Sequence, residues 1–217
     1  MNETGRSGKA RVAHQLETAR HGSTLLDRKQ HILADELERL ELFAEHSRRE
    51  WEDLASIAAT WLHRSAEMDG RDRVRAAAAD KPAIVEVNWG GAMGVSYPEN
   101  VTVQLPPERH PGGSSALSYA AQTHRDSLVA AATCAAARRA MLLVSAELTT
   151  TRLRQRAIEN TWIPRLEAKL ISIQGQLDQQ ELEESLRVRW AENNRSAEDL
   201  APSINSPISQ LSGGSDG

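Results

Sequence analysis

The chain has 217 residues, of which 40% are hydrophobic, 4% aromatic and 26% charged, and its formal net charge is −4. This composition is typical of long solvated helices rather than of a large globular core. The negative net charge argues against nucleic acid as a partner. Because no apolar run reaches the roughly 18 residues of a membrane-spanning helix, no direct membrane insertion is expected. The single cysteine, Cys134, leaves no disulfide framework, which suits the cytosol.

A first long helix is predicted over residues 9–68, after a polar segment, residues 1–8, that is expected to be frayed. Two columns of mostly apolar residues each recur every seven positions and are offset by four: Val12, Ala19, Leu26, Leu33, Leu40, Ser47, Leu54 and Trp61, and then Leu16, Ser23, Gln30, Leu37, Ala44, Trp51, Ala58 and Ser65. This alternation predicts a coiled coil, because it keeps one side of the helix facing a partner helix. Gly22 is either a tolerated surface glycine or a point of close approach by another backbone.

Residues 69–115 form a mid-chain segment in which the hydrophobic period changes from helical to alternating. Two short strands are predicted, over Ala83–Trp89 and Val101–Leu105, with a turn over Tyr97–Asn100 and with or without a third strand around Val95–Tyr97. A hairpin of this size is only marginally stable alone, so it must pack on a helix or on a partner.

A second long helix is predicted over residues 116–195, and a disordered tail over residues 196–217. Its apolar columns are expected to be Leu128, Ala135, Leu142 and Thr149, with Ala132, Ala146 and Leu153, and later Ile163, Leu166, Leu170, Ile173 and Leu177. Two successive steps of three residues, from Asn160 to Leu166, indicate local overwinding. Pro164 lies inside this stretch and crowds the carbonyl of Asn160, so a kink is predicted there.

Blocks of charge predict how the two helices pair. Residues 1–31 and 150–170 are net positive, whereas residues 35–53 and 178–199 are net negative. Opposite blocks face one another if the helices run antiparallel, with facing residue numbers adding to roughly 205. The alternative is pairing with another copy of the chain. The predicted fold class is therefore mainly α: a long antiparallel two-helix coiled coil with a small β-hairpin region inserted mid-chain.

No catalytic or metal-binding constellation is apparent in the sequence. The histidines lack the short spacings of a zinc site, no G-x-S-x-G motif is present, and the acidic residues lie in runs typical of coiled-coil flanks. The chain is therefore predicted to be non-enzymatic, with no cofactor and no metal.

Three patches of the sequence resemble the D-subunit family of V-type (vacuolar and archaeal-type) rotary ATPases. Residues 19–40 are similar to the family's A-x-x-G-x-x-L-L-K-x-K-R-D-x-L-x-x-E-F, with Gly22, Leu25, Leu26, Lys29, Leu33 and Glu36 at matching positions. Residues 93–98 resemble M-G-V-x-V-P, and residues 163–167 resemble I-P-R-L-E. The order and spacing of these patches, around a helix, strand, helix layout, make the resemblance fairly specific. Asp27, Gln30 and His31 depart from the pattern.

The resemblance implies a non-catalytic central rotor shaft that transmits torque between the catalytic ring of A and B subunits and the membrane rotor ring. It implies two further partners, which are the small F subunit and the membrane-side C/d subunit that caps the rotor ring. It also implies coupling of ATP hydrolysis or synthesis to proton or sodium transport, and a cytoplasmic location peripheral to the membrane.

Two groups of residues are expected to contact these partners. Those expected to contact the catalytic ring are Arg11, Arg20, Gly22, Arg28, Lys29, Arg165 and Lys169. Those expected to contact the membrane-side or F-like subunit are Trp89, Met93, Gly94, Val95 and Pro98. The alternative function is a non-catalytic coiled-coil scaffold or adaptor. The shaft of F-type synthases is a less suitable match, because it carries a larger α/β domain between its helices than residues 69–115 provide.

Overall fold

The structure, a computed structural model, describes residues 5–107 and 112–199. Along the chain its elements are α1 (Arg6–Asp69), α2 (Arg71–Ala76), β1 (Ile84–Ala92), β2 (Val95–Gln104), α3 (Ser115–Ala157), the π-helical segment η1 (Ile158–Trp162) and α4 (Ile163–Asp199). This arrangement of long helices around one small hairpin confirms the predicted fold class. Residues 196–199 continue α4, whereas residues 1–4 and 200–217 lie outside the described residues.

The chain divides into two compact units. Unit 1 combines the chain up to Ala19 with the chain from Trp162 onward, and unit 2 consists of Arg20–Thr161. Unit 2 therefore holds most of α1, all of α2, β1, β2 and α3, and nearly all of η1.

The predicted coiled-coil face of α1 is confirmed, because all sixteen residues of its two columns are buried or half-buried. The buried ones are Val12, Leu16, Ser23, Leu33, Leu40, Ala44, Ser47, Ala58 and Ser65. A Cβ added at Gly22 would meet no atom within 4 Å, so the alternative of close backbone approach at this glycine is wrong.

The buried face of α3 differs from the predicted one. Leu128, Leu142 and Leu153 are 44%, 51% and 61% exposed, so the predicted leucine column does not face the partner helix. The buried residues follow another 3,4 column, which is Ala120, Thr123, Ala130, Cys134, Ala137, Val144, Leu148 and Thr151, with Ala140 beside it. Most of these side chains are small, whereas the facing columns of α1 carry leucines and tryptophans. Large side chains opposite small ones fill the space between two helices well.

Contacts within unit 2 confirm the antiparallel orientation and correct the register. Early α1 residues meet η1 and the end of α3, as in the hydrogen bond of 2.6 Å from Ser23 Oγ to Glu159 Oε1 of η1. Late α1 residues meet early α3 residues, as in the edge-to-face contact of Trp61 with Tyr119, whose ring centroids lie 4.7 Å apart. Facing numbers therefore add to roughly 180, about three and a half heptads away from the predicted register.

The charge blocks failed to set the register because acidic residues of the 35–53 block pair with arginines on their own helix. The Arg48 guanidinium lies 2.9 Å from Glu45 Oε1 and 2.5 Å from Glu52 Oε1. The hydrogen bond from Arg48, with a second one from Arg49, lowers the pKa of Glu45 to about 2. Charges that are satisfied within one helix exert little preference for a register between helices.

The turn of the hairpin lies at Met93-Gly94 rather than at the predicted Tyr97–Asn100. Both residues have positive φ, of 49° and 83°, as a two-residue type I′ turn requires. β2 continues through Pro98, which lies opposite Trp89, and a bulge next to this pair accommodates one extra residue, Glu99. The hairpin therefore has two strands, without the third strand that the sequence left open.

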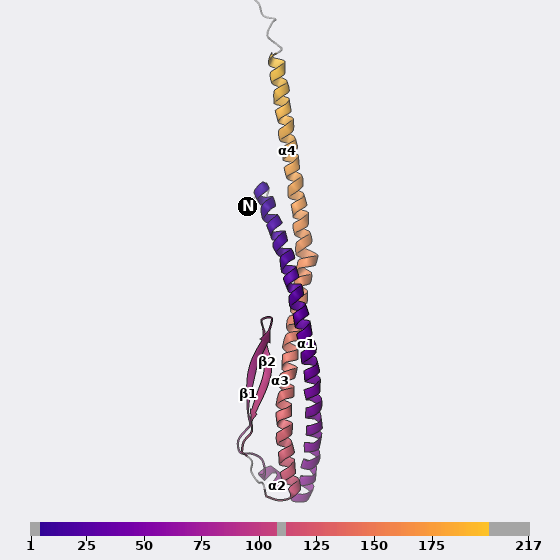
Figure 1. The fold of residues 1–217 in the computed structure, drawn as a ribbon, viewed down its shortest axis with the longest axis vertical. Helices are drawn as coiled ribbons and strands as arrows, with labels where there is room; N and C mark the ends of the chain where they lie inside the picture. Colours follow the sequence, from indigo (N-terminus) through magenta and orange to yellow (C-terminus); the bar gives the residue numbers. More distant parts are fainter. Residues whose placement is uncertain (1–4, 108–111, 200–217) are drawn as a thin grey trace, which may run out of the picture. The chain divides into compact units, whose positions relative to one another are not determined.

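The hairpin packs on the helices through the residues nearest its turn. Tyr97 belongs to a buried cluster with Leu33 and Leu40 of α1 and with Ala140, Val144 and Leu148 of α3. Ala92 and Val95, which flank the turn, pack against the same cluster. Figure 1 shows β2 running beside α3, with β1 on the far side of β2. The core of unit 2 thus includes the hairpin that a two-helix interpretation treats as an insertion.

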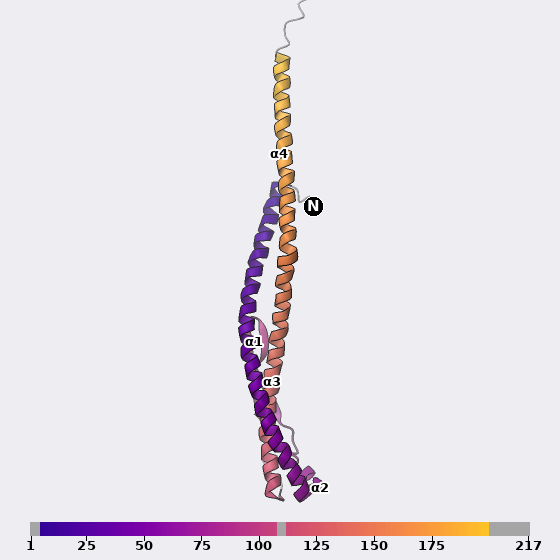
Figure 2. The same cartoon turned by 90° about the vertical axis from the view of Figure 1, so that its right-hand side faces the viewer.

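The far end of the helical pair is closed by contacts between the end of α1 and the start of α3. The Asp69 carboxylate accepts hydrogen bonds from Ser114 N, at 3.0 Å, and from the Ser114 hydroxyl. Ser114 is itself the N-cap of α3, because its side chain accepts a hydrogen bond from Leu117 N. α2 follows directly after Gly70, and Figures 1 and 2 both show it at this end of the pair.

The predicted irregularity at Pro164 takes the form of the π-helical segment η1, which ends at Trp162, two residues before Pro164. Proline has no N–H to donate to the carbonyl of Asn160, and its ring crowds that carbonyl. A wider turn relieves the crowding and offers the carbonyls other donors. Bending of the helix at this point stays a prediction.

Unit 1 is held by a short apolar contact and one exposed ion pair. Val12 and Leu16 of α1 are buried, as is Ile173 of α4, and the predicted column Ile163, Leu166, Leu170, Ile173 and Leu177 is buried or half-buried. Arg6 Nη2 lies 3.2 Å from Glu181 Oε1, with both side chains largely exposed. From residue 178 to residue 195 every residue of α4 is exposed, and α4 continues beyond the start of α1 (Figures 1 and 2).

Candidate partner-binding surfaces

The basic residues predicted to contact a surrounding ring lie on the surfaces of α1 and α4. Arg11, Arg20 and Arg28 are exposed on α1, and Arg165 and Lys169 are exposed on α4. Their exposure leaves them accessible to a partner. Gly22 lies half-buried on α1 and contributes no side chain to this surface.

Lys29 has an internal role that the sequence did not predict. Its ammonium lies 2.6 Å from Glu147 Oε1, and both side chains are about three-quarters buried, at 23% and 27% exposure. The hydrogen bond from Lys29 lowers the pKa of Glu147 below its ordinary value. Lys29 therefore joins α1 to α3, and its positive charge is already paired with Glu147 before any partner binds.

A polar cluster occupies the contact of α1 with the end of α3 and the start of η1. Glu159 accepts hydrogen bonds from Ser23 Oγ at 2.6 Å and from Gln155 Nε2 at 2.9 Å, and these lower the pKa of Glu159. Gln30 of α1 donates a hydrogen bond to Gln155. Four polar residues thus replace apolar packing at this level, which makes the contact specific in register rather than strongly apolar.

The hairpin residues predicted to contact a partner separate into two groups. Trp89 and Met93 are 61% and 43% exposed, and Gly94 is exposed at the turn. Val95 is half-buried against the core cluster and Pro98 is buried, so these two residues serve internal packing. The outward part of the hairpin is therefore its first strand together with the tip.

Tyr97 and its partners form a polar link between the hairpin and α1 that the sequence did not reveal. The Tyr97 hydroxyl donates a hydrogen bond to Glu36, which also lies 2.6 Å from Arg39 Nη2. The hydrogen bond from Arg39 is the main cause of the lowered pKa of Glu36, whereas burial raises the pKa of Tyr97. The only sequence signal was the position of Tyr97 within the strand pattern, because 61 residues separate it from Glu36.

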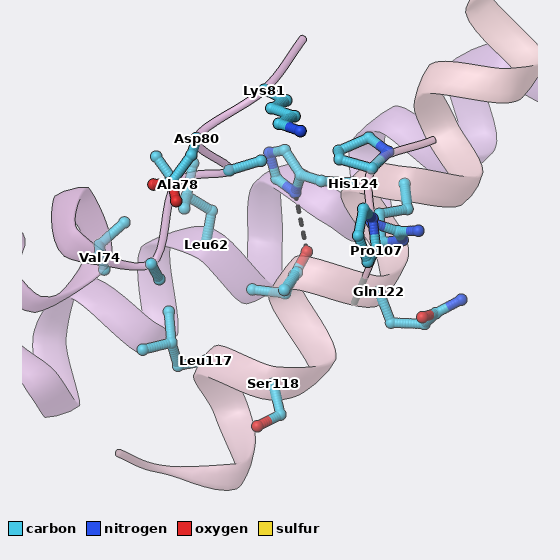
Figure 3. A pocket seen from close by; sticks show the side chains of 16 residues that line it. Leu62, Val74, Ala78, Asp80, Lys81, Pro107, Leu117, Ser118, Gln122 and His124 are labelled. Carbon is cyan, nitrogen blue, oxygen red and sulfur yellow. Dashed lines mark hydrogen bonds between the residues drawn. The ribbon is translucent and has the colours of Figure 1, made fainter. Parts of the chain in front are cut away.

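A cavity of about 720 Å³ lies where α2, the segments on either side of the hairpin and the first turns of α3 meet. Figure 3 shows apolar walls that include Leu62, Val74 and Leu117, with Lys81 and His124 on the polar side. The ring nitrogen Nδ1 of His124 lies 3.0 Å from the Ala120 carbonyl oxygen, which fixes the orientation of the ring. No pattern in the sequence indicates this cavity, because its walls come from four separate segments.

Two features of the described residues concern metal ligands and membrane spans. No group of three or more metal-ligating side chains gathers within residues 5–107 and 112–199. One helix in these ranges, Ser115–Arg195, is long and apolar enough to cross a membrane by length and composition alone. This is weak evidence for a membrane span, because core helices of soluble proteins pass the same test. Cys134 is buried in the α3 column and is inaccessible as a nucleophile.

Comparison with known proteins supplies the family. The model of the family described as the D subunit of ATP synthase matches residues 9–193, which cover both long helices and the hairpin between them. No curated protein matches the chain in sequence. The family is a structural, not a catalytic, subunit that works together with other subunits of the complex. The chain therefore belongs to the ATP synthase D-subunit family and has the role of a stalk subunit of a rotary ATPase.

Proposed function

We propose that this chain is the central rotor shaft of a V-type rotary ATPase. In this role it transmits torque between the catalytic ring of A and B subunits and the membrane-side C/d subunit that caps the rotor ring. It thereby couples ATP hydrolysis or synthesis to the transport of protons or sodium ions. The chain itself is non-catalytic, binds no cofactor, and lies in the cytoplasm at the periphery of the membrane.

The observation that carries this proposal is the construction of unit 2 in a chain of this family. α1 and α3 run antiparallel with a continuous buried column on each. The Lys29–Glu147 pair joins α1 to α3, and the Ser23–Glu159 hydrogen bond joins α1 to η1. Two packed helices resist twisting better than one. Twisting the pair would make the helices slide past one another, and sliding would break the side-chain packing in every layer of the buried columns. Resistance to twisting is the mechanical property that a torque-transmitting element needs.

The expected partner surfaces follow from exposure. The exposed basic residues on α1 and α4 are proposed to face the catalytic ring, with Arg165 and Lys169 next to Pro164 as its main contacts. The hairpin tip with Trp89 and Met93 is proposed to face the membrane-side subunit or the F-like subunit. Lys29, Val95 and Pro98 are secondary members of these surfaces, because internal contacts already occupy them.

Co-purification tests the proposal. The tagged full chain, isolated from its native cells, is expected to bring A-type and B-type catalytic subunits and a small F-like subunit. A self-associated coiled coil without these subunits would instead support a scaffold or adaptor and would contradict the proposal.

Charge reversal then tests the ring contact within the recovered complex. The double substitution Arg165→Glu with Lys169→Glu is expected to lower its ATPase activity several-fold, because like charges in a shaft contact repel. The control is Arg71→Glu, an exposed basic residue on α2 in unit 2, which is expected to leave the activity unchanged.

A further inference from the structure

The outer edge of β1 is unpaired within the described residues. The sheet has two strands, and β2 is the one that contacts α3, so β1 has a neighbour on one side only. The first six residues of β1 are all exposed. A nine-residue strand therefore presents one row of its backbone groups to solvent (Figure 1).

The register of the hairpin identifies which backbone groups point outward. Ala92 and Val95 flank a two-residue turn, and such residues form a hydrogen-bonded pair. Bonded and non-bonded positions alternate along an antiparallel strand, so the N–H and C=O groups of Val85, Val87 and Trp89 point away from β2. The position of Pro98 agrees with this pattern, because it lies opposite Trp89, where no ladder hydrogen bond needs its missing N–H.

The side chains at these outward positions are apolar and exposed. Val85, Val87 and Trp89 are 49%, 40% and 61% exposed. Val85 lies opposite Val103 and Val87 opposite Val101, so four valines share one face of the hairpin. Open edges of this kind are normally protected by lysine, by proline or by a bulge on the outer strand. β1 has no lysine or proline, and the extra residue of the bulge, Glu99, belongs to β2.

The charge of the hairpin indicates what kind of strand fits this edge. Residues 84–104 contain the acids Glu86 and Glu99 and no lysine or arginine. Pairing of two copies edge to edge would therefore gather four carboxylates, which like-charge repulsion disfavours. A strand with basic residues on the face of Glu86 and apolar residues on the valine face would satisfy both sides of β1.

We propose that β1 is a docking edge to which another subunit of the rotary complex adds an extended, basic and apolar strand. The added strand takes its affinity from the outward backbone groups of β1 and its specificity from the valine face and Glu86. It also turns a marginally stable two-stranded hairpin into a three-stranded sheet. The proposal rests on the proposed function only in taking the partner to be a subunit of the same complex.

Amide hydrogen exchange tests the proposal directly. The tagged full chain is compared alone and in the complex recovered with it, at single-residue resolution over residues 84–92. The amides of Val85, Val87 and Trp89 are expected to exchange at least tenfold more slowly in the complex. Those of Glu86 and Asn88, which already bond β2, should change little. An assembled complex without this alternating protection would overturn the docking edge while leaving the shaft function intact. If no ATPase subunits are recovered, the shaft function fails, and the docking edge fails with it.

A pair of substitutions separates backbone pairing from side-chain contact. Val87→Pro removes an outward N–H and leaves the ladder with β2 intact, whereas Val87→Ala keeps the N–H and removes most of the side chain. Retention of one subunit in the complex is expected to fall at least tenfold with Val87→Pro and less than threefold with Val87→Ala. Equal losses would show a side-chain contact and overturn strand addition. If the isolated chain forms a dimer at high concentration and the same outward amides of β1 then exchange slowly, β1 pairs with a second copy of the chain. That result would also overturn strand addition by another subunit.

The partner can be identified by cross-linking. Because Cys134 is buried, a cysteine introduced as Val87→Cys is the accessible thiol of the described residues and can carry a photoreactive maleimide. Cross-links to a single subunit within the assembled complex support the docking edge. Cross-links to a second copy of the chain contradict it.

Discussion

The two units of this chain pair long helices in different ways. Unit 2 buries a contiguous cluster that includes Leu33, Val144 and Tyr97, and it adds polar links that are largely shielded from solvent. Unit 1 buries Val12, Leu16 and Ile173 and adds an ion pair whose two side chains are 85% and 63% exposed. Unit 2 is thus built to hold one register, whereas the long exposed part of α4 is left available to other molecules.

This difference explains where the stability of the chain should reside. Burial of apolar side chains is the main stabilising term in folding, whereas exposed ion pairs contribute about 0–1 kcal/mol. Substitutions in the unit 2 cluster should therefore have large effects, and substitutions on the exposed part of unit 1 should have small ones.

The largest effect is expected at the most buried leucine. Leu33→Ala, at a residue with 0% exposure, should lower the free energy of unfolding by about 2–5 kcal/mol, because it leaves a cavity in the cluster. The matched change in unit 1, Leu182→Ala at 60% exposure, should change it by less than about 0.5 kcal/mol. Urea unfolding followed by circular dichroism measures both. Similar losses for the two variants would contradict the contrast between the units.

The next effect tests the column of small residues in α3. Ala140→Leu should destabilise unit 2 by about 1–3 kcal/mol, because the added side chain has no space at a position with 0% exposure. Ala146→Leu is the matched control, because Ala146 is exposed on the same helix within the leucine column first predicted to be buried. If Ala146→Leu were the more damaging substitution, the assignment of the α3 face would be wrong.

A smaller effect is expected at the polar link of the hairpin. Tyr97→Phe should cost about 0.5–1.5 kcal/mol, because it removes the hydrogen bond to Glu36 and keeps the ring in the cluster. Tyr119→Phe is the control, because Tyr119 is 50% exposed and its hydroxyl makes no hydrogen bond with the described residues. The midpoints of thermal unfolding of both variants are measured at neutral pH. Equal midpoints would show that the hydrogen bond from Tyr97 to Glu36 does not stabilise the chain.

The smallest effect concerns the Lys29–Glu147 pair and has a defined pH dependence. The pKa of Glu147 is lowered in the folded chain. The contribution of the Lys29–Glu147 pair to the free energy of unfolding is therefore complete above the ordinary pKa of 4.5 and is lost as the pH falls below that value. Lys29→Met should cost about 0–1 kcal/mol at pH 7 and progressively less below pH 4.5. Arg6→Met in unit 1 serves as the exposed counterpart, with no measurable change expected. A cost for Lys29→Met that grew on acidification would contradict the pairing.

The sequence predicted the fold well where large apolar residues carry the pattern. The columns of α1 are marked by leucines and tryptophans, and every position proved buried or half-buried. In α3 the same rule failed, because the buried column consists mainly of alanine, threonine and cysteine while Leu128, Leu142 and Leu153 face solvent. The 3,4 spacing of these small residues was present in the sequence, but hydrophobic size favoured the other face.

The register and the hairpin turn were mispredicted for physical reasons of a different kind. Acidic residues of α1 found partners on their own helix, so the charge blocks carried little information about the partner helix. Pro98 resembles a turn residue, yet it fits a strand position that needs no N–H, and the turn formed at Gly94, where positive φ is tolerated. The link between Tyr97 and Glu36 depends on that corrected register and therefore lay beyond sequence reasoning.

The measurement that tests the shaft function most directly is rotation of this chain within the assembled complex. Arg75→Cys on α2 introduces a thiol on a largely exposed side chain, which can be biotinylated selectively because Cys134 is buried. With the catalytic ring fixed to a surface, a bead on this thiol should turn in one direction when ATP is added and stop when ATP is removed. A bead that stays still while the complex hydrolyses ATP would show that the chain belongs to the stationary part, and it would contradict the rotor-shaft account.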